Sequence, residues 1–297
     1  VIKLRIITTQ VKLIAEPTFA FLVVFIRNFI TEDPQIFLLI CALITNTLII
    51  LTLYRYAHPF FIGVYLYITW GAYLVTMNGV RQFLAAAIIF VATKWLLEGK
   101  WKLFLGVVLF ASTIHTSALF YIPAYFIAKQ QAWNRKIFLL IMLLIGGFLL
   151  FGSLIPYLFG MLMWSKYWSY QESFENASLG ANAVRAIIAA IPVIIAFFSR
   201  KKLSAEYEES NILVNFSLIN FFFMLFATYN WIFARMSIYF NLYNLILLPL
   251  IIRVNFTDRW LRNIVYYLLI LLFLFYYYYE TIVTLDIKYV SKFLSLQ

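Results

Sequence analysis

The sequence predicts an all-α, polytopic integral membrane protein with about eight transmembrane helices and one re-entrant helical hairpin. Of its 297 residues, 65% are hydrophobic and 12% are charged. Soluble domains carry charge on about a quarter of their residues, so this chain lacks the surface that such a domain needs. Its apolar runs approach the ~20 residues with which a helix crosses the hydrocarbon layer. We find no linker and no internal repeat, and we therefore expect one membrane domain over 1–297.

The predicted transmembrane helices are the apolar runs between polar interruptions. They cover 36–53, 60–77, 81–97, 137–158, 184–198, 212–229, 237–252 and 264–280. Residues 1–35 precede them as an outward N-terminal segment, in which the short apolar run 19–30 is expected to lie in the outer interface. Residues 159–183 form the longest outward loop.

The positive charges of the connections orient these helices. Every second connection is strongly basic, and these connections hold Arg55, Lys100, Lys102, Lys129, Arg135, Lys136, Arg200, Lys201, Lys202, Arg253, Arg259 and Arg262. The connections between them carry four cations, which are Arg81, Lys166, Arg185 and Arg235. By the positive-inside rule the first set faces the cytoplasm. The second set and both termini then face outward.

Residues 103–128 do not fit a single crossing, because basic residues that favour the cytoplasm flank them on both sides. The run is divided by Ser112-Thr113-Ile114-His115-Thr116-Ser117 into two apolar halves of about a dozen residues, each too short to span. We expect a re-entrant hairpin that enters from the cytoplasmic side, with His115 near its tip. The alternative is one long bent helix that breaks the charge rule locally.

The beginning of the chain suggests an N-terminal truncation. The sequence opens on Val1 and carries no cleavable signal peptide. An outward segment of this length ordinarily follows an upstream crossing, so we expect that a first transmembrane segment is missing.

The three outward arginines Arg81, Arg185 and Arg235 are the first candidates for a binding site. Asn78 and Gly79 precede Arg81-Gln82 at the outward start of a helix, where free N–H groups and the helix dipole favour an anion. Such an arginine is often an interfacial anchor. Three of them on the side that repels cations favour a shared anion site, because the guanidinium fork matches phosphate oxygens.

Outward carboxylates and one histidine are candidates for proton transfer. Glu16 precedes Pro17, which is typical of a helix start but also suits a substrate role. His115 is an ionisable group within an apolar stretch, and its alternative role is to hold the hairpin turn by hydrogen bonds. Trp168 and Glu172 belong to the 159–183 loop, whose aromatic and charged residues suit either a carbohydrate platform or an interfacial aromatic belt.

Some classes of function have no support in the sequence. Two separate histidines and a single cysteine, Cys41, make a bound catalytic metal and a disulfide unexpected. The net charge of +11 is accounted for by orientation and contact with anionic lipid, so no nucleic-acid partner is implied. We expect no cofactor.

Several of these motifs resemble the EpsG family of exopolysaccharide biosynthesis proteins. The stretch from Gly79 to Ala85 resembles the family's G-[LIV]-R-Q-x-[LI]-A motif, and the residues from His115 to Leu119 resemble its histidine-serine-alanine-leucine phrase. Glu16-Pro17-Thr18-Phe19 resembles a Glu-Pro-Gly-aromatic motif, with Thr18 where glycine is usual. The segment that begins at Arg235 resembles a late arginine-containing motif.

The resemblance implies a Wzy-like polymerase, a glycosyltransferase that joins repeat units carried on undecaprenyl pyrophosphate. It would work in the bacterial plasma membrane with its site facing outward, without metal or nucleotide, in contact with the bilayer and with other polysaccharide-assembly proteins. Arg81, Arg235, Glu16 and His115 are then the catalytic candidates. The candidates for binding substrate are Arg185, Asn78, Gln82, Glu172 and Trp168. A flippase for the same lipid-linked sugars and a glycan ligase are the alternatives.

Overall fold

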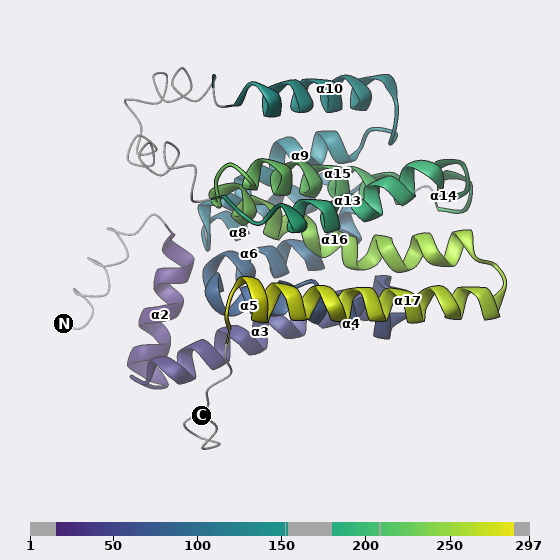
Figure 1. Cartoon of the computed structure of the whole chain (residues 1–297). Coiled ribbons are helices and arrows are strands. Elements are labelled where there is room, and N and C mark those ends of the chain that lie inside the picture. Colours follow the sequence, from purple (N-terminus) through teal and green to yellow (C-terminus); the bar gives the residue numbers. More distant parts are fainter. Residues whose placement is uncertain (1–15, 152, 154–179, 208, 288–297) are drawn as a thin grey trace.

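The computed structural model describes residues 16–151, 153, 180–207 and 209–287, and every regular element among them is helical (Figure 1). The elements in chain order are α2 (Pro17–Phe29), α3 (Pro34–Tyr56), α4 (Phe60–Thr69), α5 (Ala72–Asn78), α6 (Val80–Val91), α7 (Thr93–Leu97), α8 (Trp101–Ser112), η1 (Thr116–Phe120), α9 (Tyr121–Ala128), α10 (Arg135–Leu149), α13 (Ala183–Phe198), α14 (Arg200–Glu206), α15 (Ser210–Ala227), α16 (Ile232–Asn255), α17 (Arg259–Tyr278) and the π-helical turn η4 (Tyr279–Thr284).

Within the described residues, each predicted transmembrane run is mainly helical, but the structure does not confirm eight spans. In the described part of the chain, α3, α15, α16 and the continuous α17–η4 segment are long and apolar enough to cross a membrane. The pairs α4–α5 and α13–α14 could each be one span, although they bend by 51° and 76°. By length and composition, the described residues therefore contain four to six candidate spans. Gly71, in the left-handed region at φ 84°, makes the first bend sterically accessible.

The two runs that fall short do so because their helices are short. The run 81–97 is divided at Ala92 into α6 and α7, and the 12 residues of α6 rise about 18 Å against a hydrocarbon thickness of about 30 Å. The described part of 137–158 is α10, with 15 residues. The remainder of that run, apart from residues 150, 151 and 153, lies outside the described residues.

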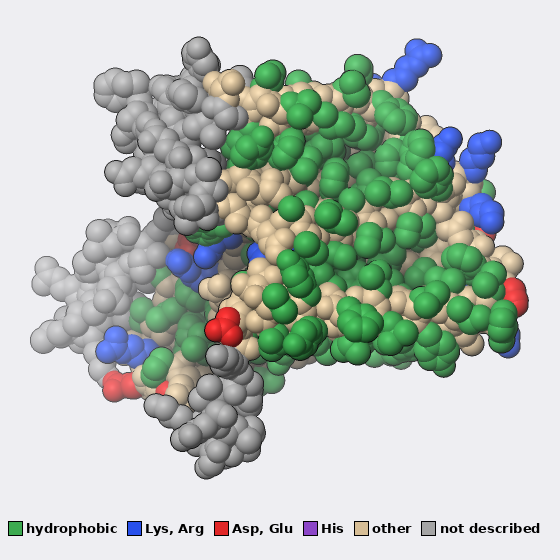
Figure 2. All heavy atoms as spheres, viewed as in Figure 1, with side chains coloured by type: hydrophobic (Ala, Val, Ile, Leu, Met, Phe, Trp, Pro, Cys, Tyr) green, Lys and Arg blue, Asp and Glu red, His purple; other side chains and the backbone are tan. Residues whose placement is uncertain are grey.

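Helix α16 is the centre of the bundle. In an apolar stretch of 18 residues of α16, 83% of the residues are buried inside the protein. The corresponding values are 28% for α3 and 22% for the α17–η4 segment. Aromatic rings pack it against its neighbours: the Tyr243 ring centroid lies 4.5 Å from that of Phe216 on α15, and the Phe240 centroid 5.0 Å from that of Tyr121 on α9. Figure 2 shows the apolar side chains of the outer helices as a broad hydrophobic band.

The predicted hairpin is present, and the alternative of one long bent helix is wrong. Helix α8 ends at Ser112, His115 has extended backbone angles, and η1 and α9 return along α8. Phe104 stacks on Tyr125 with ring centroids 5.7 Å apart, and the Lys129 ammonium lies beside Gly99. The two ends of the hairpin therefore meet, and His115 lies at its tip. Entry from the cytoplasmic side stays a prediction.

The chain connections gather at two opposite ends of the bundle (Figure 1). The basic end contains the α9–α10, α13–α14 and α16–α17 connections. These connections and the helix ends next to them carry most of the cations assigned above to the cytoplasm. The site end contains the start of α2, the α5–α6 junction, the hairpin tip, and the ends of α13, α16 and α17 that meet there. Helix α2 lies at a steep angle to α3 at this end, and its position in the outer interface stays a prediction.

The orientation of these two ends can be tested by cysteine labelling in intact cells. In a Cys41→Ser background, Glu32→Cys at the α2–α3 turn should react with a membrane-impermeant maleimide, whereas Lys202→Cys on α14 should react only after the cells are opened. Both positions are exposed, so burial does not explain a difference. Labelling of Lys202→Cys but not of Glu32→Cys in intact cells would reverse the predicted orientation.

Candidate functional site

The centre of the site end is the carboxylate of Glu16, which is 7% exposed. Its Oε2 accepts a hydrogen bond from Arg81 Nη1 at 2.8 Å. Its Oε1 lies 2.5 Å from His115 Nδ1 and 3.2 Å from the backbone N of Thr116, which donates to it. Two side chains and one amide from three separate parts of the chain thus converge on one buried carboxylate. Both oxygens of this carboxylate are therefore occupied by groups of the protein.

The local sequence explains how Glu16 reaches this position. Pro17 begins α2 with its fixed φ angle, and Glu16 precedes it as the N-cap residue. The Glu16 side chain makes no capping bond, so it is available for Arg81 and His115. Thr18 fixes the segment on the hairpin tip, because its amide donates to the Thr113 carbonyl at 3.0 Å and the two hydroxyl oxygens lie 2.6 Å apart.

Arg81 is held on one side and open on the other. One guanidinium nitrogen binds Glu16, and the guanidinium carbon lies 5.7 Å from the centre of the Phe19 ring. The side chain nevertheless remains 52% exposed. The ion pair orients the guanidinium while its other N–H groups remain able to bind an anion.

Gln82 makes a contact within the bundle, and its role in binding substrate stays a prediction. Its Nε2 donates to the Arg235 carbonyl at 2.6 Å, and the residue is 3% exposed. Gln82 therefore connects the first turn of α6 to the first turn of α16 and presents little surface to a ligand. Through it, the backbones that carry Arg81 and Arg235 are fixed relative to each other.

Arg235 projects from the start of α16 beside Trp231, with 4.9 Å between the guanidinium carbon and the ring centre. Its guanidinium group, like that of Arg81, is close enough to His115 for its positive charge to act on the imidazole. Among the described residues Arg235 has no ion-pair partner. Of the three arginines, it is therefore the one whose charge is least compensated by the described part of the protein.

Arg185 pairs with a carboxylate that sequence reasoning missed. Its Nε donates to Glu280 Oε1 at 2.6 Å, and a second guanidinium nitrogen contacts the same oxygen. Glu280 is 6% exposed, and within the described residues its Oε2 has no hydrogen-bond partner. The sequence feature that could have identified Glu280 is a single acid directly after the Tyr276–Tyr279 run, at the end of a predicted span.

A pocket of about 280 Å³ joins several of these side chains. Arg185 and Glu280 line it from one side, and Arg235 lines it from α16. Asn78 also lines it, at the end of α5. Its remaining wall includes the aromatic residues Trp70, Phe83, Trp231, Tyr276 and Tyr277. Arg81 does not line the pocket, but it lies two residues after Gly79, which does.

The predicted set of site residues is thus brought together in part. The structure places Arg81, Glu16 and His115 in one cluster, and Arg185, Asn78 and Arg235 around the adjoining pocket. Two of the three arginines bind carboxylates, so the site is less positive than three free arginines would make it. Trp168 and Glu172 lie outside the described residues.

Comparison with known proteins gives one match. A model of the EpsG family matches residues 4–293, which is nearly the whole chain. No curated protein and no solved structure matches it.

The Arg185–Glu280 pair offers a test of whether these charges are mutually dependent. Arg185→Met or Glu280→Leu alone should lower stability by roughly 1–3 kcal/mol, because each leaves a largely buried polar group without its partner. The double variant should recover much of this loss. Thermal unfolding in detergent measures the effect, and Lys100→Met, which breaks the exposed pair with Glu98, is a control expected to change little. A double variant less stable than both single variants would show that the two residues act independently.

Proposed function

Because the chain belongs to the EpsG family, we propose that it is a Wzy-like polysaccharide polymerase that joins repeat units carried on undecaprenyl pyrophosphate. The observation that carries this proposal is the convergence of Glu16, Arg81 and His115 beside the pocket lined by Arg235. This arrangement provides a candidate base and candidate phosphate ligands at one end of a membrane-embedded bundle.

His115 is the proposed general base. When His115 donates from Nδ1 to the Glu16 carboxylate, its Nε2 is the nitrogen left to accept a proton. The carboxylate fixes the ring and stabilises the imidazolium that forms, as in other carboxylate–histidine pairs. Glu16 is accordingly a positioning residue in this mechanism, since Arg81 and Thr116 already occupy its oxygens.

The reaction is a displacement at the anomeric carbon of the donor sugar. A hydroxyl of the acceptor repeat unit gives its proton to His115 Nε2, and its oxygen forms a bond to that carbon. The bond between the anomeric carbon and the phosphate oxygen breaks, and undecaprenyl pyrophosphate leaves with the electron pair. Arg235 and the open side of Arg81 stabilise the charge that develops on the leaving group.

The adjoining pocket is proposed to hold sugar units. Aromatic faces such as those of Trp231 and Tyr277 can pack against sugar rings, and Asn78 and Asn241 supply amide groups for hydroxyls. The carboxylates of Glu16 and Glu280 hold the guanidinium groups of Arg81 and Arg185 in place and limit the repulsion between these cations. An incoming pyrophosphate then meets oriented donors rather than mobile ones.

The proposed location is the bacterial plasma membrane, with the site end facing outward. The distribution of positive charge between the two ends supports this orientation. A donor activated by lipid pyrophosphate needs no nucleotide, so the reaction can proceed on that side. Other polysaccharide-assembly membrane proteins are the expected partners.

The direct test is polymerisation by the purified full chain in lipid. A defined undecaprenyl-pyrophosphate repeat unit is added without nucleotide or metal, and product lengths are measured by mass spectrometry. A ladder of glycans on the lipid carrier supports a polymerase. Transfer of the lipid-linked unit between leaflets without a ladder would instead indicate a flippase. Transfer to a different acceptor without chain growth would indicate a ligase.

The role of His115 predicts a large loss of rate from one substitution. His115→Ala should lower kcat by about 10²–10⁴-fold, the usual contribution of a general base. Glu16→Gln should also lower kcat, since the ring loses its charged partner. His58→Ala is the matched control, because His58 lies near the opposite end beside Arg55 and Arg253. Equal losses in His115→Ala and His58→Ala would contradict the assignment.

The role of Arg235 predicts a similarly localised effect on the leaving group. Arg235→Ala should lower kcat by about 10²–10³-fold, as expected when one donor to a developing negative charge is removed. Arg253→Ala removes the same charge from the other end of the same helix and should leave the rate close to that of the wild type. A polymer yield in Arg235→Ala equal to that in Arg253→Ala would exclude Arg235 from the reaction.

A further inference from the structure

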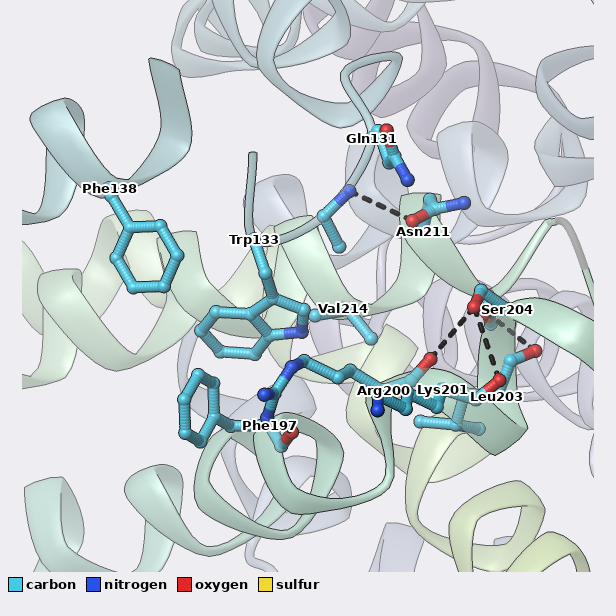
Figure 3. Close-up of a pocket in the computed structure, with 12 residues that line it drawn as sticks. Gln131, Trp133, Phe138, Phe197, Arg200, Lys201, Leu203, Ser204, Asn211 and Val214 are labelled. Atoms are coloured by element: carbon cyan, nitrogen blue, oxygen red, sulfur yellow. Dashed lines mark hydrogen bonds between the residues drawn. The ribbon is translucent and has the colours of Figure 1, made fainter. Parts of the chain in front are cut away.

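A second pocket, far from the proposed catalytic site, lies at the basic end of the bundle. Its volume is about 350 Å³, and the α9–α10 connection, α10, α13, α14 and α15 form its walls (Figure 3). We call it the Trp133 pocket. The residues used below are Trp133, Phe138, Phe197, Arg200, Lys201 and Ser204, all of which line it.

The charge of the Trp133 pocket has one sign. Arg200 and Lys201 line it, and no carboxylate is among its lining residues in the described part of the chain. The Arg200 guanidinium carbon lies 4.4 Å from the centre of the Phe197 ring, and its Nη1 donates to the Phe197 carbonyl at 2.9 Å. Figure 3 shows this side chain extending beneath Trp133 towards Phe197. The guanidinium is thus oriented before any ligand binds, with donors remaining for an anion.

The wall that faces these cations is rigidly built. Asn211 accepts a hydrogen bond from the Ala132 amide at 2.8 Å, and Asn215 donates to the carbonyls of Ile127, Ala128 and Gln130. Trp133 has φ 65°, a left-handed conformation that is uncommon for a bulky residue. Its ring packs edge-on against Phe197 with 5.1 Å between centroids. The connection therefore holds an aromatic side chain in place despite an unfavourable backbone conformation.

The other side of the pocket is apolar and continues along two helices. Phe138 on α10 is 44% exposed. Beyond it, α10 presents Leu139 and Met142, and α13 presents Ile194 and Phe198, all of them exposed large apolar side chains. Helix α10 is weakly integrated, because among its 15 residues Ile137 is the one that is buried. In Figure 1 this helix runs at the edge of the bundle.

From this combination we propose that the Trp133 pocket binds the headgroup phosphate of an anionic phospholipid. The phosphate would lie on Arg200 and Lys201, and the acyl chains would lie along the exposed apolar side chains of α10 and α13. Basic pockets between helices are a recognised form of binding site for anionic headgroups. A free phosphate ion would use the cations but not the apolar surface. The bound lipid would also complete the packing of α10, which has few buried contacts of its own.

The proposal is tested by measuring which lipid the purified full chain retains. The protein is exposed in neutral detergent to equal amounts of phosphatidylglycerol and phosphatidylcholine with identical acyl chains, and bound lipid is counted by native mass spectrometry. The wild type should retain phosphatidylglycerol preferentially. The double variant Arg200→Ala/Lys201→Ala should bind it about 30-fold more weakly, given a contribution of about five- to sixfold from each cation.

Two further variants separate a pocket from a charged surface and from misfolding. Arg259→Ala/Arg262→Ala removes the same charge from the first turn of α17 and should retain the lipid. Ser204→Trp fills the pocket without changing its charge and should lose the lipid. Equal losses in the two double variants, retention by Ser204→Trp, or displacement of the lipid by millimolar inorganic phosphate would each overturn the proposal. If Arg200→Ala/Lys201→Ala unfolds at a lower temperature than the wild type in phosphatidylcholine, its loss of lipid is not interpreted. The result for Ser204→Trp then decides: loss of the lipid supports the proposal, and retention overturns it.

Discussion

The ion-paired carboxylate of Glu16 is the interaction on which the site end depends. Burying a carboxylate costs free energy unless charged or hydrogen-bonding partners replace the lost water. Here Arg81, His115 and the Thr116 amide are those partners, and they come from α6 and from the hairpin tip. One side chain at the start of α2 therefore fixes two other parts of the chain, and the candidate base and phosphate ligand receive their positions from it.

Helix α16 gives this cluster a rigid support. The hydroxyl oxygen of Tyr239, a buried residue of this helix, lies 2.9 Å from that of Ser117. The backbone carbonyl of Tyr239 accepts a hydrogen bond from the Tyr121 hydroxyl at 2.7 Å. Both partners belong to the returning half of the hairpin, so the tip that carries His115 is bound to the helix that carries Arg235. Gln82 completes the connection from α6. The site is thus assembled on the most buried helix, although its residues lie near the surface at one end.

The two ends of the bundle use positive charge differently. At the site end, Arg81 and Arg185 are paired with Glu16 and Glu280, which orients them and reduces their mutual repulsion. At the basic end, the described residues that line the Trp133 pocket include Arg200 and Lys201 and no carboxylate. The site end thus combines two arginines oriented by carboxylates with Arg235, whereas the Trp133 pocket places its cations beside apolar surface, as proposed above for a bound lipid.

The sequence by itself determined the helical membrane class, the hairpin with His115 at its tip, and Glu16 and Arg81 as candidates. These follow from apolar run length, from basic residues on both sides of 103–128, and from the few polar groups in an apolar chain. It could not give the number of spans, since the break at Ala92 and the bends at Gly71 and Ser199 depend on packing. Only the tertiary structure decided which residues pair with each other. Glu16 and His115 are 99 residues apart in the sequence, and Arg185 and Glu280 are 95 residues apart. Sequence spacing carries no information about such distant contacts. The burial of Gln82 was likewise decided by the tertiary structure, because the approach of α6 to α16 is a property of the packed bundle.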